Sequence, residues 1–173
     1  MNAANMLRSL GPLVLLCLAI VAFTKWRQGP EERVQTVDPA STVQLAAARA
    51  GYPVQAPAGL AAGSRTTSAR TDAGSARPGG PVTLEIGYLT PLQQYAGFVE
   101  SDDPGAQPVR AVLSGATPHG SVDIAGNAWT RSATTRGETV LSRTVGSVTL
   151  LVTGSATEKE LETVAGAVRP YSG

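Results

Sequence analysis

The chain has 173 residues, with 14 Lys and Arg against 13 Asp and Glu, so its formal net charge is only +1. A nucleic-acid-binding protein usually shows a basic excess, and none is present here. The single His and the single Cys exclude a zinc site of Cys and His ligands, an intramolecular disulfide framework and most His-based acid–base catalysis. The length suits one domain and an appendage.

An uncharged stretch of sixteen residues separates Arg8 from Lys25 near the start of the chain. A membrane-spanning helix needs about 20 mostly apolar residues. Arg8 and Lys25 can extend their charges towards the lipid headgroups, and Trp26 suits the aromatic belt at a membrane surface. We therefore predict a short tail over residues 1–9 and a transmembrane anchor over residues 10–26.

A cleaved signal peptide is an alternative interpretation of this segment, because it also combines a basic start with a short apolar stretch. Signal cleavage needs small residues at positions −3 and −1, and a cut after Ala22 would put Ile20 at −3. A lipoprotein cysteine needs a small residue before it, whereas Leu16 precedes Cys17. A buried core helix is a further alternative, but the segment has no polar face. These features favour an uncleaved anchor.

The orientation of the anchor is argued from the charges that flank it. Lys25, Arg27 and Arg33 follow the apolar stretch, whereas one arginine precedes it, and this count alone favours a cytoplasmic C-terminal side. A signal anchor so near the start of a chain instead often leaves the bulk of the chain outside. We predict a juxtamembrane linker over residues 27–37 and an extracytoplasmic domain over residues 38–173.

The first half of this domain begins with an Asp–Pro pair, which predicts the start of a helix over residues 38–50. Two prolines make residues 52–57 extended, and residues 66–71 form a polar edge strand. A Gly- and Pro-rich loop over residues 74–80 leads into a strand over residues 82–89, where apolar side chains alternate.

The segment that follows this strand is expected to be helical. Residues 90–93 read Thr-Pro-Leu-Gln, which fits a capping box with Pro in the first turn. We therefore predict a helix over residues 90–101, with Leu92, Tyr95 and Val99 facing inward.

The second half of the domain predicts a meander of strands. An acidic loop over residues 100–105 and a short helix over residues 109–113 come first. Alternating apolar residues with Gly-containing turns then predict four strands over residues 121–153. The last of them, residues 148–153, is the most apolar and is expected at the centre of the sheet. A second capping box begins a helix over residues 158–169.

This order of elements predicts an α+β domain in which helices pack against a mainly antiparallel sheet. Four runs of the chain together resemble an uncharacterised family of actinobacterial single-pass membrane proteins with a small domain of unknown function: residues 51–54, 84–91, 124–130 and 148–154. The resemblance implies a cell-membrane location with the domain outside. Its motifs are structural, so they carry over no catalytic residue. The order of strands and helices also resembles small binding domains of the PsbP type, in fold alone.

The acidic and imidazole side chains give little sign of chemistry. His119 has no second His or Cys nearby in the sequence, so we interpret it as a solvated loop residue. Glu100, Asp102 and Asp103 form the densest acidic cluster, but they lack the ligand spacing of a Ca²⁺ loop. We therefore predict that this cluster is a solvated helix end.

Basic and aromatic side chains are also interpreted as structural. Arg131, Arg136 and Arg143 fall on neighbouring predicted strands, where they form either a small patch for an anionic ligand or, more simply, strand-edge charges. Trp129 and Tyr88 are expected in the core. If they instead lined a concave surface, they would mark a binding site.

We assign no catalytic, cofactor-binding or metal-binding residue and expect no cofactor. The predicted function is that of a membrane-anchored, non-catalytic extracytoplasmic binding or interaction module of the cell envelope. Its partners would be the lipid bilayer, through the N-terminal helix, and an envelope protein or other ligand, but not a nucleic acid. The alternative is an envelope enzyme that uses Ser or carboxylate chemistry. A sensor is less favoured, because fewer than ten residues precede the anchor.

Overall fold

Residues 14, 16–21 and 36–172 are described by the computed structural model of the chain. The predicted tail and the larger part of the predicted anchor and linker lie outside the described residues. Residues 14 and 16–21 are helical. Among the residues that the structure describes, no helix is both long enough and apolar enough to cross a membrane. Residues 36–173 form a compact unit by themselves.

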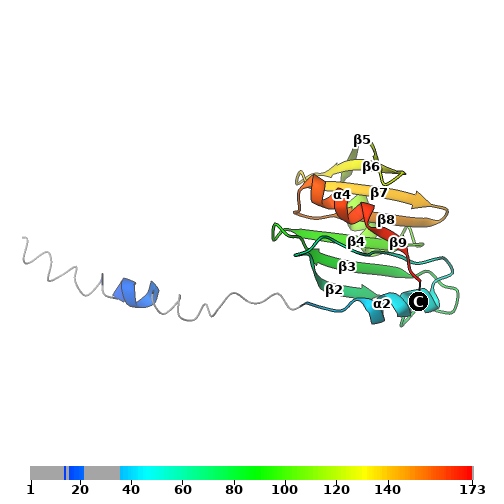
Figure 1. The fold of residues 1–173 in the computed structure, drawn as a ribbon, viewed down its shortest axis with the longest axis horizontal. Helices are drawn as coiled ribbons and strands as arrows, with labels where there is room; N and C mark the ends of the chain where they lie inside the picture. The colour runs from blue at the N-terminus through cyan, green and yellow to red at the C-terminus, as the bar shows by residue number, and fades with distance from the viewer. Residues whose placement is uncertain (1–13, 15, 22–35, 173) are drawn as a thin grey trace, which may run out of the picture. The chain divides into compact units, whose positions relative to one another are not determined.

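The domain is built around a seven-stranded sheet with the strand order β2-β3-β4-β8-β7-β6-β5, in which every neighbouring pair is antiparallel (Figure 1). A separate antiparallel ribbon joins β1 to β9. This arrangement confirms the predicted α+β class and its mainly antiparallel sheet. The elements are α2 (Ala40–Arg49), β1 (Gln55–Pro57), β2 (Arg65–Thr71), β3 (Thr83–Leu89), β4 (Tyr95–Ser101), α3 (Gln107–Leu113), β5 (Ala116–Ile124), β6 (Asn127–Thr134), β7 (Thr139–Val145), β8 (Val148–Thr153), α4 (Glu158–Gly166) and β9 (Val168–Pro170).

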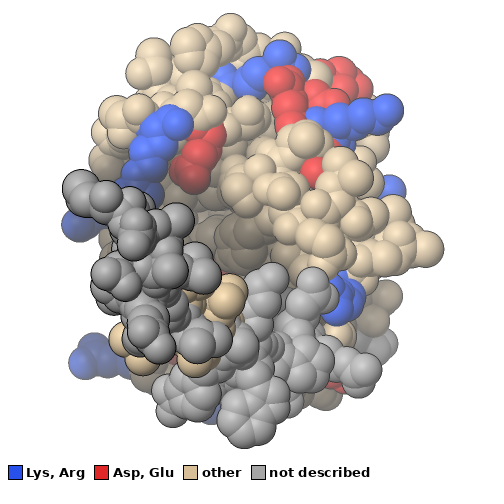
Figure 2. Space-filling view, turned by 90° about the vertical axis from the view of Figure 1, so that its left-hand side faces the viewer, with Lys and Arg blue, Asp and Glu red and all other residues tan. Residues whose placement is uncertain are grey.

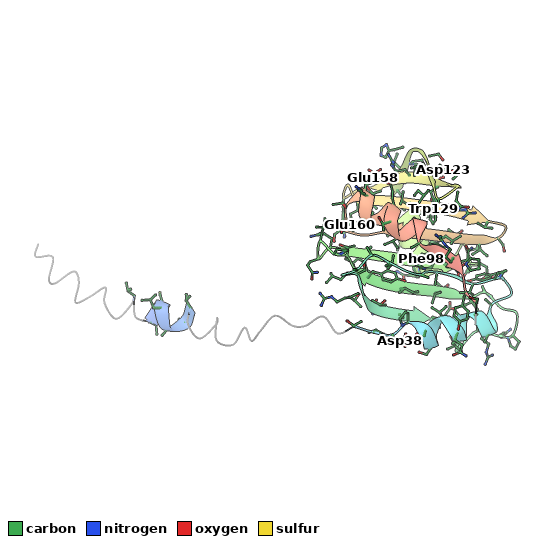
Figure 3. All side chains as sticks on the ribbon, viewed as in Figure 1. Asp38, Phe98, Asp123, Trp129, Glu158 and Glu160 are labelled. Carbon is green, nitrogen blue, oxygen red and sulfur yellow. The ribbon has the colours of Figure 1, made fainter. Side chains whose placement is uncertain are left out.

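One face of the sheet carries the main hydrophobic core, beneath α2 and α4 (Figure 1). Figure 3 shows Phe98 and Trp129 on the sheet beside α4. Alternate residues of each strand point to this face, as the period of a β-strand requires. The largest apolar side chains of this core are at most 2 % exposed: Leu84, Ile86, Phe98, Trp129, Leu141, Leu150, Val152 and Leu161.

The opposite face carries a smaller cluster beneath α3. Its buried members are Val99, Ala106, Val109, Val140 and Leu151. This helix is short, so it covers only part of the sheet, and polar side chains occupy much of the remaining face. The two faces therefore differ in how far they are closed to solvent.

Strand β8 lies at the centre of the seven strands, as its apolar sequence predicts. The capping box at the start of α4 is also confirmed. The Thr157 hydroxyl accepts a hydrogen bond from the Glu160 amide, and the Glu160 carboxylate accepts one from the Thr157 amide. These bonds satisfy two backbone donors that would otherwise lack a helical partner.

The predicted helix over residues 90–101 is wrong, because this segment forms a hairpin turn and strand β4. The Thr90 amide donates to the Gln94 carbonyl, and the Thr90 hydroxyl accepts from the Gln94 amide. Gln93 takes a positive φ of 59°, which a helix does not allow. The Thr-to-Gln spacing of a capping box thus serves a tight turn here. Leu92, expected to face inward, is 65 % exposed.

Two further predictions, for the end of the last helix and the start of strand β5, are wrong. The last helix ends at Gly166 rather than residue 169, because residues 168–170 pair with β1. The Tyr171 amide extends this pairing by donating to the Val54 carbonyl. Strand β5 begins at Ala116 rather than residue 121, so His119 lies in an edge strand and not in a loop. The register of β5 shifts between Pro118 and Gly120, which interrupts the alternation seen in the sequence.

Candidate binding groove

A groove runs beside α3 on the less covered face of the sheet. It comprises two adjoining hollows of about 240 and 480 Å³, which share Tyr95, Ala111, Val112 and Thr153. Small-molecule sites usually fill about 300–1,000 Å³, so the groove has a suitable size for a ligand. We call these two hollows together the α3 groove. Figure 2 shows the end of the domain at which the β3–β4 turn lies, where basic and acidic side chains lie next to one another.

The floor of the smaller hollow is a pair of glycines beneath a tyrosine. Gly87 and Gly97 face each other across β3 and β4. A Cβ atom built on Gly87 would lie 3.0 Å from Tyr95 Cε2, and one on Gly97 would lie 3.1 Å from the Tyr95 hydroxyl oxygen. The ring therefore lies across the glycine pair, a position that larger residues would obstruct. Even so, Tyr95 is 48 % exposed.

The backbone at the start of β4 is held in place by the residues that follow β8. The Tyr95 amide donates to the Ser155 hydroxyl, and the Tyr95 carbonyl accepts from the Ala156 amide. Gly154 has a φ of +150°, and a Cβ atom there would collide with the Tyr95 carbonyl. Glycine is thus required at this position, and its close approach holds Tyr95 in place.

Polar side chains of opposite charge surround the tyrosine. Arg70 of β2 and Glu85 of β3 line the smaller hollow, together with Gln107 at the start of α3. Partial burial raises the pKa of the Tyr95 hydroxyl, the nearby Glu85 carboxylate raises it further, and Arg70 lowers it. The hydroxyl therefore stays protonated at neutral pH, as both a donor and an acceptor.

The larger hollow continues the groove past the ends of β6 and β8. Arg136 and Glu138, in the turn between β6 and β7, line it together with Thr134 and Ser155. The groove thus has a basic and an acidic side chain at each end, with hydroxyl groups between them. This composition suits a polar, uncharged ligand better than a strongly charged one.

Glu100 contradicts the prediction of a solvated acidic cluster. It lies in β4 on the core face and is fully buried, at 0 % exposed. Its two carboxylate oxygens accept from the Gln55 amide of β1, at 3.1 and 2.9 Å. Burial raises the Glu100 pKa to about 8, and the nearby Asp102 adds to the rise, although the Gln55 bond opposes it. Asp102 itself accepts from the Val82 amide at 2.8 Å.

The other acidic and imidazole candidates lie apart from Glu100. Asp103 accepts from the Gly105 amide at 2.7 Å in the turn that follows β4. His119 is exposed in the edge strand β5. Within residues 36–172 and the short described helix, no group of three His, Cys, Asp or Glu side chains is placed to hold a metal ion.

The three arginines of the predicted basic patch have different surroundings. Arg131 forms ion pairs with Glu158 at 2.6 Å and Glu162 at 3.4 Å, so its charge joins β6 to α4. Arg136 lines the α3 groove, whereas Arg143 lines a separate shallow hollow beside the β5–β6 turn. The structure therefore does not bring them together as one anion site.

Trp129 and Tyr88 are both core residues, at 1 % and 3 % exposed, as predicted. Trp129 lies in the main core together with Leu161 and Val164 of α4. Its indole Nε1 is buried without a hydrogen-bond partner in the described part of the chain. Neither aromatic side chain lines the α3 groove, so neither marks a binding surface.

Tyr95 is a surface residue that the sequence pattern does not predict, because the pattern indicates a helix over this segment. A signal was present, since Gly97 interrupts the predicted helix, and Gly in a helix interior costs about 1 kcal/mol relative to Ala. An isolated Gly inside a strand pattern marks a close approach of other groups. Gly87 gives the same signal in β3, and the two glycines are partners in the hairpin.

Comparison with known proteins gives a family but no relative of known activity. The family described as "Protein of unknown function (DUF4245)" matches residues 1–168, so the chain belongs to this family. The predicted membership of an uncharacterised family is thereby confirmed, while the actinobacterial source and the single membrane pass stay predictions. No curated protein and no solved structure matches the chain.

Proposed function

We propose that this member of the DUF4245 family is a membrane-anchored, non-catalytic binding module whose domain lies outside the cytoplasm, in the cell envelope. The observation that carries the proposal is the α3 groove, in which an exposed aromatic ring lies among polar side chains on an otherwise well-packed domain. Concave sites with a few convergent polar groups are the usual places where small ligands bind.

The membrane part of the proposal rests on the apolar stretch between Arg8 and Lys25. Its described residues are helical, and their large apolar side chains are 50–59 % exposed. Exposed apolar side chains gathered in one helix mark a surface that binds another protein or a membrane. A lipid bilayer is the partner that suits a helix flanked by Arg8, Lys25 and Trp26.

A binding role also agrees with the architecture. An antiparallel sheet with helices on its faces is the arrangement that suggested a likeness to PsbP-type binding domains. The likeness concerns the order of the elements alone, and fold does not determine function. It supports the proposal only because a broad, partly uncovered sheet face offers room for a ligand.

The alternative of an envelope enzyme depends on a carboxylate or serine that substrate can reach. Burial raises the pKa of the Glu100 carboxyl to about 8, and groups with perturbed pKa values often mark active sites. However, its carboxylate is fully buried beneath β1 and bonded to the Gln55 amide. A substrate would have to displace the β1–β9 ribbon to contact it, so Glu100 does not support the enzyme.

Fractionation and protease accessibility test the location. The full-length protein should stay in the membrane pellet after a carbonate wash, and a protease added to intact spheroplasts should digest its domain. A soluble form that lacks residues 1–22 would show a cleaved signal peptide instead. Protection of the domain until the cells are lysed would place it in the cytoplasm and overturn this orientation.

Photo-crosslinking in living cells tests the binding role. A photoreactive amino acid at Gln107, which is exposed and lines the groove, should capture a specific product. The same amino acid at Arg169, which is exposed in β9 and lines neither hollow of the groove, serves as the matched control. Equal yields at the two positions would argue against the α3 groove as a binding site.

A further inference from the structure

We infer that the α3 groove binds a saccharide chain, with one sugar ring stacked on Tyr95. This inference rests on the proposed binding function and names the class of ligand. Three features carry it: an open aromatic ring, a balanced set of hydrogen-bonding groups around that ring, and a groove that continues beyond it.

Tyr95 has the features of a stacking platform. The contacts with the Gly87 and Gly97 positions fix one side of the ring, and nearly half of the residue stays open at 48 % exposed. The carbon-bound hydrogens of a sugar ring form a weakly positive apolar face. Because the face of an aromatic ring is electron-rich, the two faces attract each other. A ring held in advance loses little conformational freedom when a ligand binds.

The groups around Tyr95 match the hydroxyl groups of a sugar. Arg70 donates, Glu85 accepts, and the Gln107 amide can do both. The Thr153 hydroxyl donates to the Thr139 carbonyl and can still accept. A sugar hydroxyl also donates and accepts, so one ligand can satisfy all four side chains. A peptide would instead offer mainly backbone amides and carbonyls. An extended peptide usually binds through these groups along the open edge of a sheet.

The charges of the groove argue against an anionic ligand. Glu85 lines the smaller hollow beside Arg70, and Glu138 lines the larger one beside Arg136. Each basic side chain that could bind a phosphate or carboxylate thus has an acidic neighbour lining the same hollow, which disfavours a second negative charge. A neutral polyhydroxylated chain meets no such penalty.

The length of the groove favours a chain over a single sugar. The two hollows of about 240 and 480 Å³ meet at Tyr95 and Thr153. A ring stacked on Tyr95 in the smaller hollow would leave the larger one, with Thr134 and Ser155, for the units that follow. Binding should therefore strengthen as the oligosaccharide grows beyond one unit.

The test uses the full-length protein in an amine-oxide detergent, because a detergent with a sugar headgroup would compete. Saturation-transfer NMR measures contact with three probes: chitohexaose, cellohexaose and maltohexaose. At least one of them should show transfer that Tyr95→Ala weakens by about tenfold, as the loss of a stacked aromatic ring predicts. Tyr95→Phe keeps the ring and should stay within about twofold of the natural protein.

Two further variants keep the result interpretable. Tyr171→Ala removes another exposed tyrosine, outside the groove, and should leave binding unchanged. Ala111→Trp fills the groove from the exposed side of α3 and should abolish binding even if Tyr95→Ala fails to fold. Absence of saturation transfer to all three probes would contradict saccharide binding in the α3 groove. Full binding by Ala111→Trp would contradict it as well. A specific crosslink at Gln107 in that case would leave the proposed binding function standing with a different ligand.

Discussion

The two faces of the central sheet differ in what covers them. The face beneath α2 and α4 is sealed by a continuous core that includes Trp129, Phe98, Leu84 and Leu150. The face beneath α3 has a cluster of five buried residues, and beside it the open groove around Tyr95. A tightly packed core resists changes of volume, whereas an open groove can accept a ligand without repacking. One face thus holds the larger part of the buried core, and the other carries the groove that we propose as a binding surface.

The largest expected effect comes from opening the sealed face. Trp129→Ala should destabilise a fragment of residues 36–173 by about 3–5 kcal/mol, the usual cost of truncating a large buried aromatic. Such a loss would be a large part of a typical stability of about 5–15 kcal/mol. Urea unfolding measures the change. Thr130→Ala, at the exposed neighbouring position of β6, is the matched control and should have little effect.

A small effect of Trp129→Ala would contradict the division between the faces, because Trp129 is a large member of this core and only 1 % exposed. The unpartnered indole nitrogen adds a second comparison. Since Trp129 Nε1 is buried without a partner among the described residues, Trp129→Phe gives up no hydrogen bond seen there and should cost much less than Trp129→Ala.

The second effect depends on pH and concerns Glu100, the buried carboxylate of the sealed face. Its pKa is raised to about 8 in the folded state, so the folded protein keeps a proton that the unfolded chain releases above its ordinary pKa of 4.5. The free energy of unfolding should therefore fall as the pH rises from about 4.5 to 8. Each pKa unit corresponds to about 1.4 kcal/mol, so the total is a few kcal/mol.

Glu100→Gln tests the origin of this pH dependence. The amide oxygen of Gln can still accept from the Gln55 amide, but the side chain does not ionise. The variant should be more stable than the natural protein at pH 8 and lose the decline between pH 4.5 and 8. An unchanged decline in the variant would show that Glu100 is not its origin.

The meander of the second half was predictable because its signals are local. The turns at Gly126, Gly137 and Gly146 all need a positive φ, which Gly adopts freely. Alternation between these turns then fixes which side chains face the core, and the burial of Val140 and Leu141 on opposite faces follows it. The sequence therefore predicted three of these strands closely, but the start of β5 was hidden by its register shift.

Gly87 and Gly97 gave a local signal of a close approach, but the α3 groove and the burial of Glu100 both depend on long-range pairing. Tyr95 reaches the surface only when residues 95–101 form a strand beside β3, and the Thr90–Gln93 spacing indicated a helix instead. Glu100 is buried because β1 lies over it, and β1 is fixed by β9 at the far end of the chain. No local pattern of the sequence contains these contacts.

A smaller effect is expected from the cluster beneath α3. Val109→Ala removes two methyl groups from a side chain that is 2 % exposed, and at about 0.8 kcal/mol per buried carbon it should cost about 1–2 kcal/mol. Urea unfolding of Val109→Ala and of Trp129→Ala, measured side by side, compares the contributions of the two faces to stability. Arg110→Ala, at the exposed next position of α3, should change the stability little. A cost for Val109→Ala as large as that of Trp129→Ala would show that both faces support the fold equally.

The smallest effect is expected at the edge of the sheet, where neither face is closed. His119 lies in β5 at the point where the register with β6 shifts, and its side chain is exposed. Because an exposed side chain at an irregular edge makes few contacts that depend on its identity, His119→Ala should change the free energy of unfolding by no more than about 0.5 kcal/mol. It should also leave the Gln107 crosslink intact, since His119 lines neither hollow of the groove. Loss of the crosslink in His119→Ala, with an unchanged unfolding curve, would move the binding surface from the α3 groove to the β5 edge.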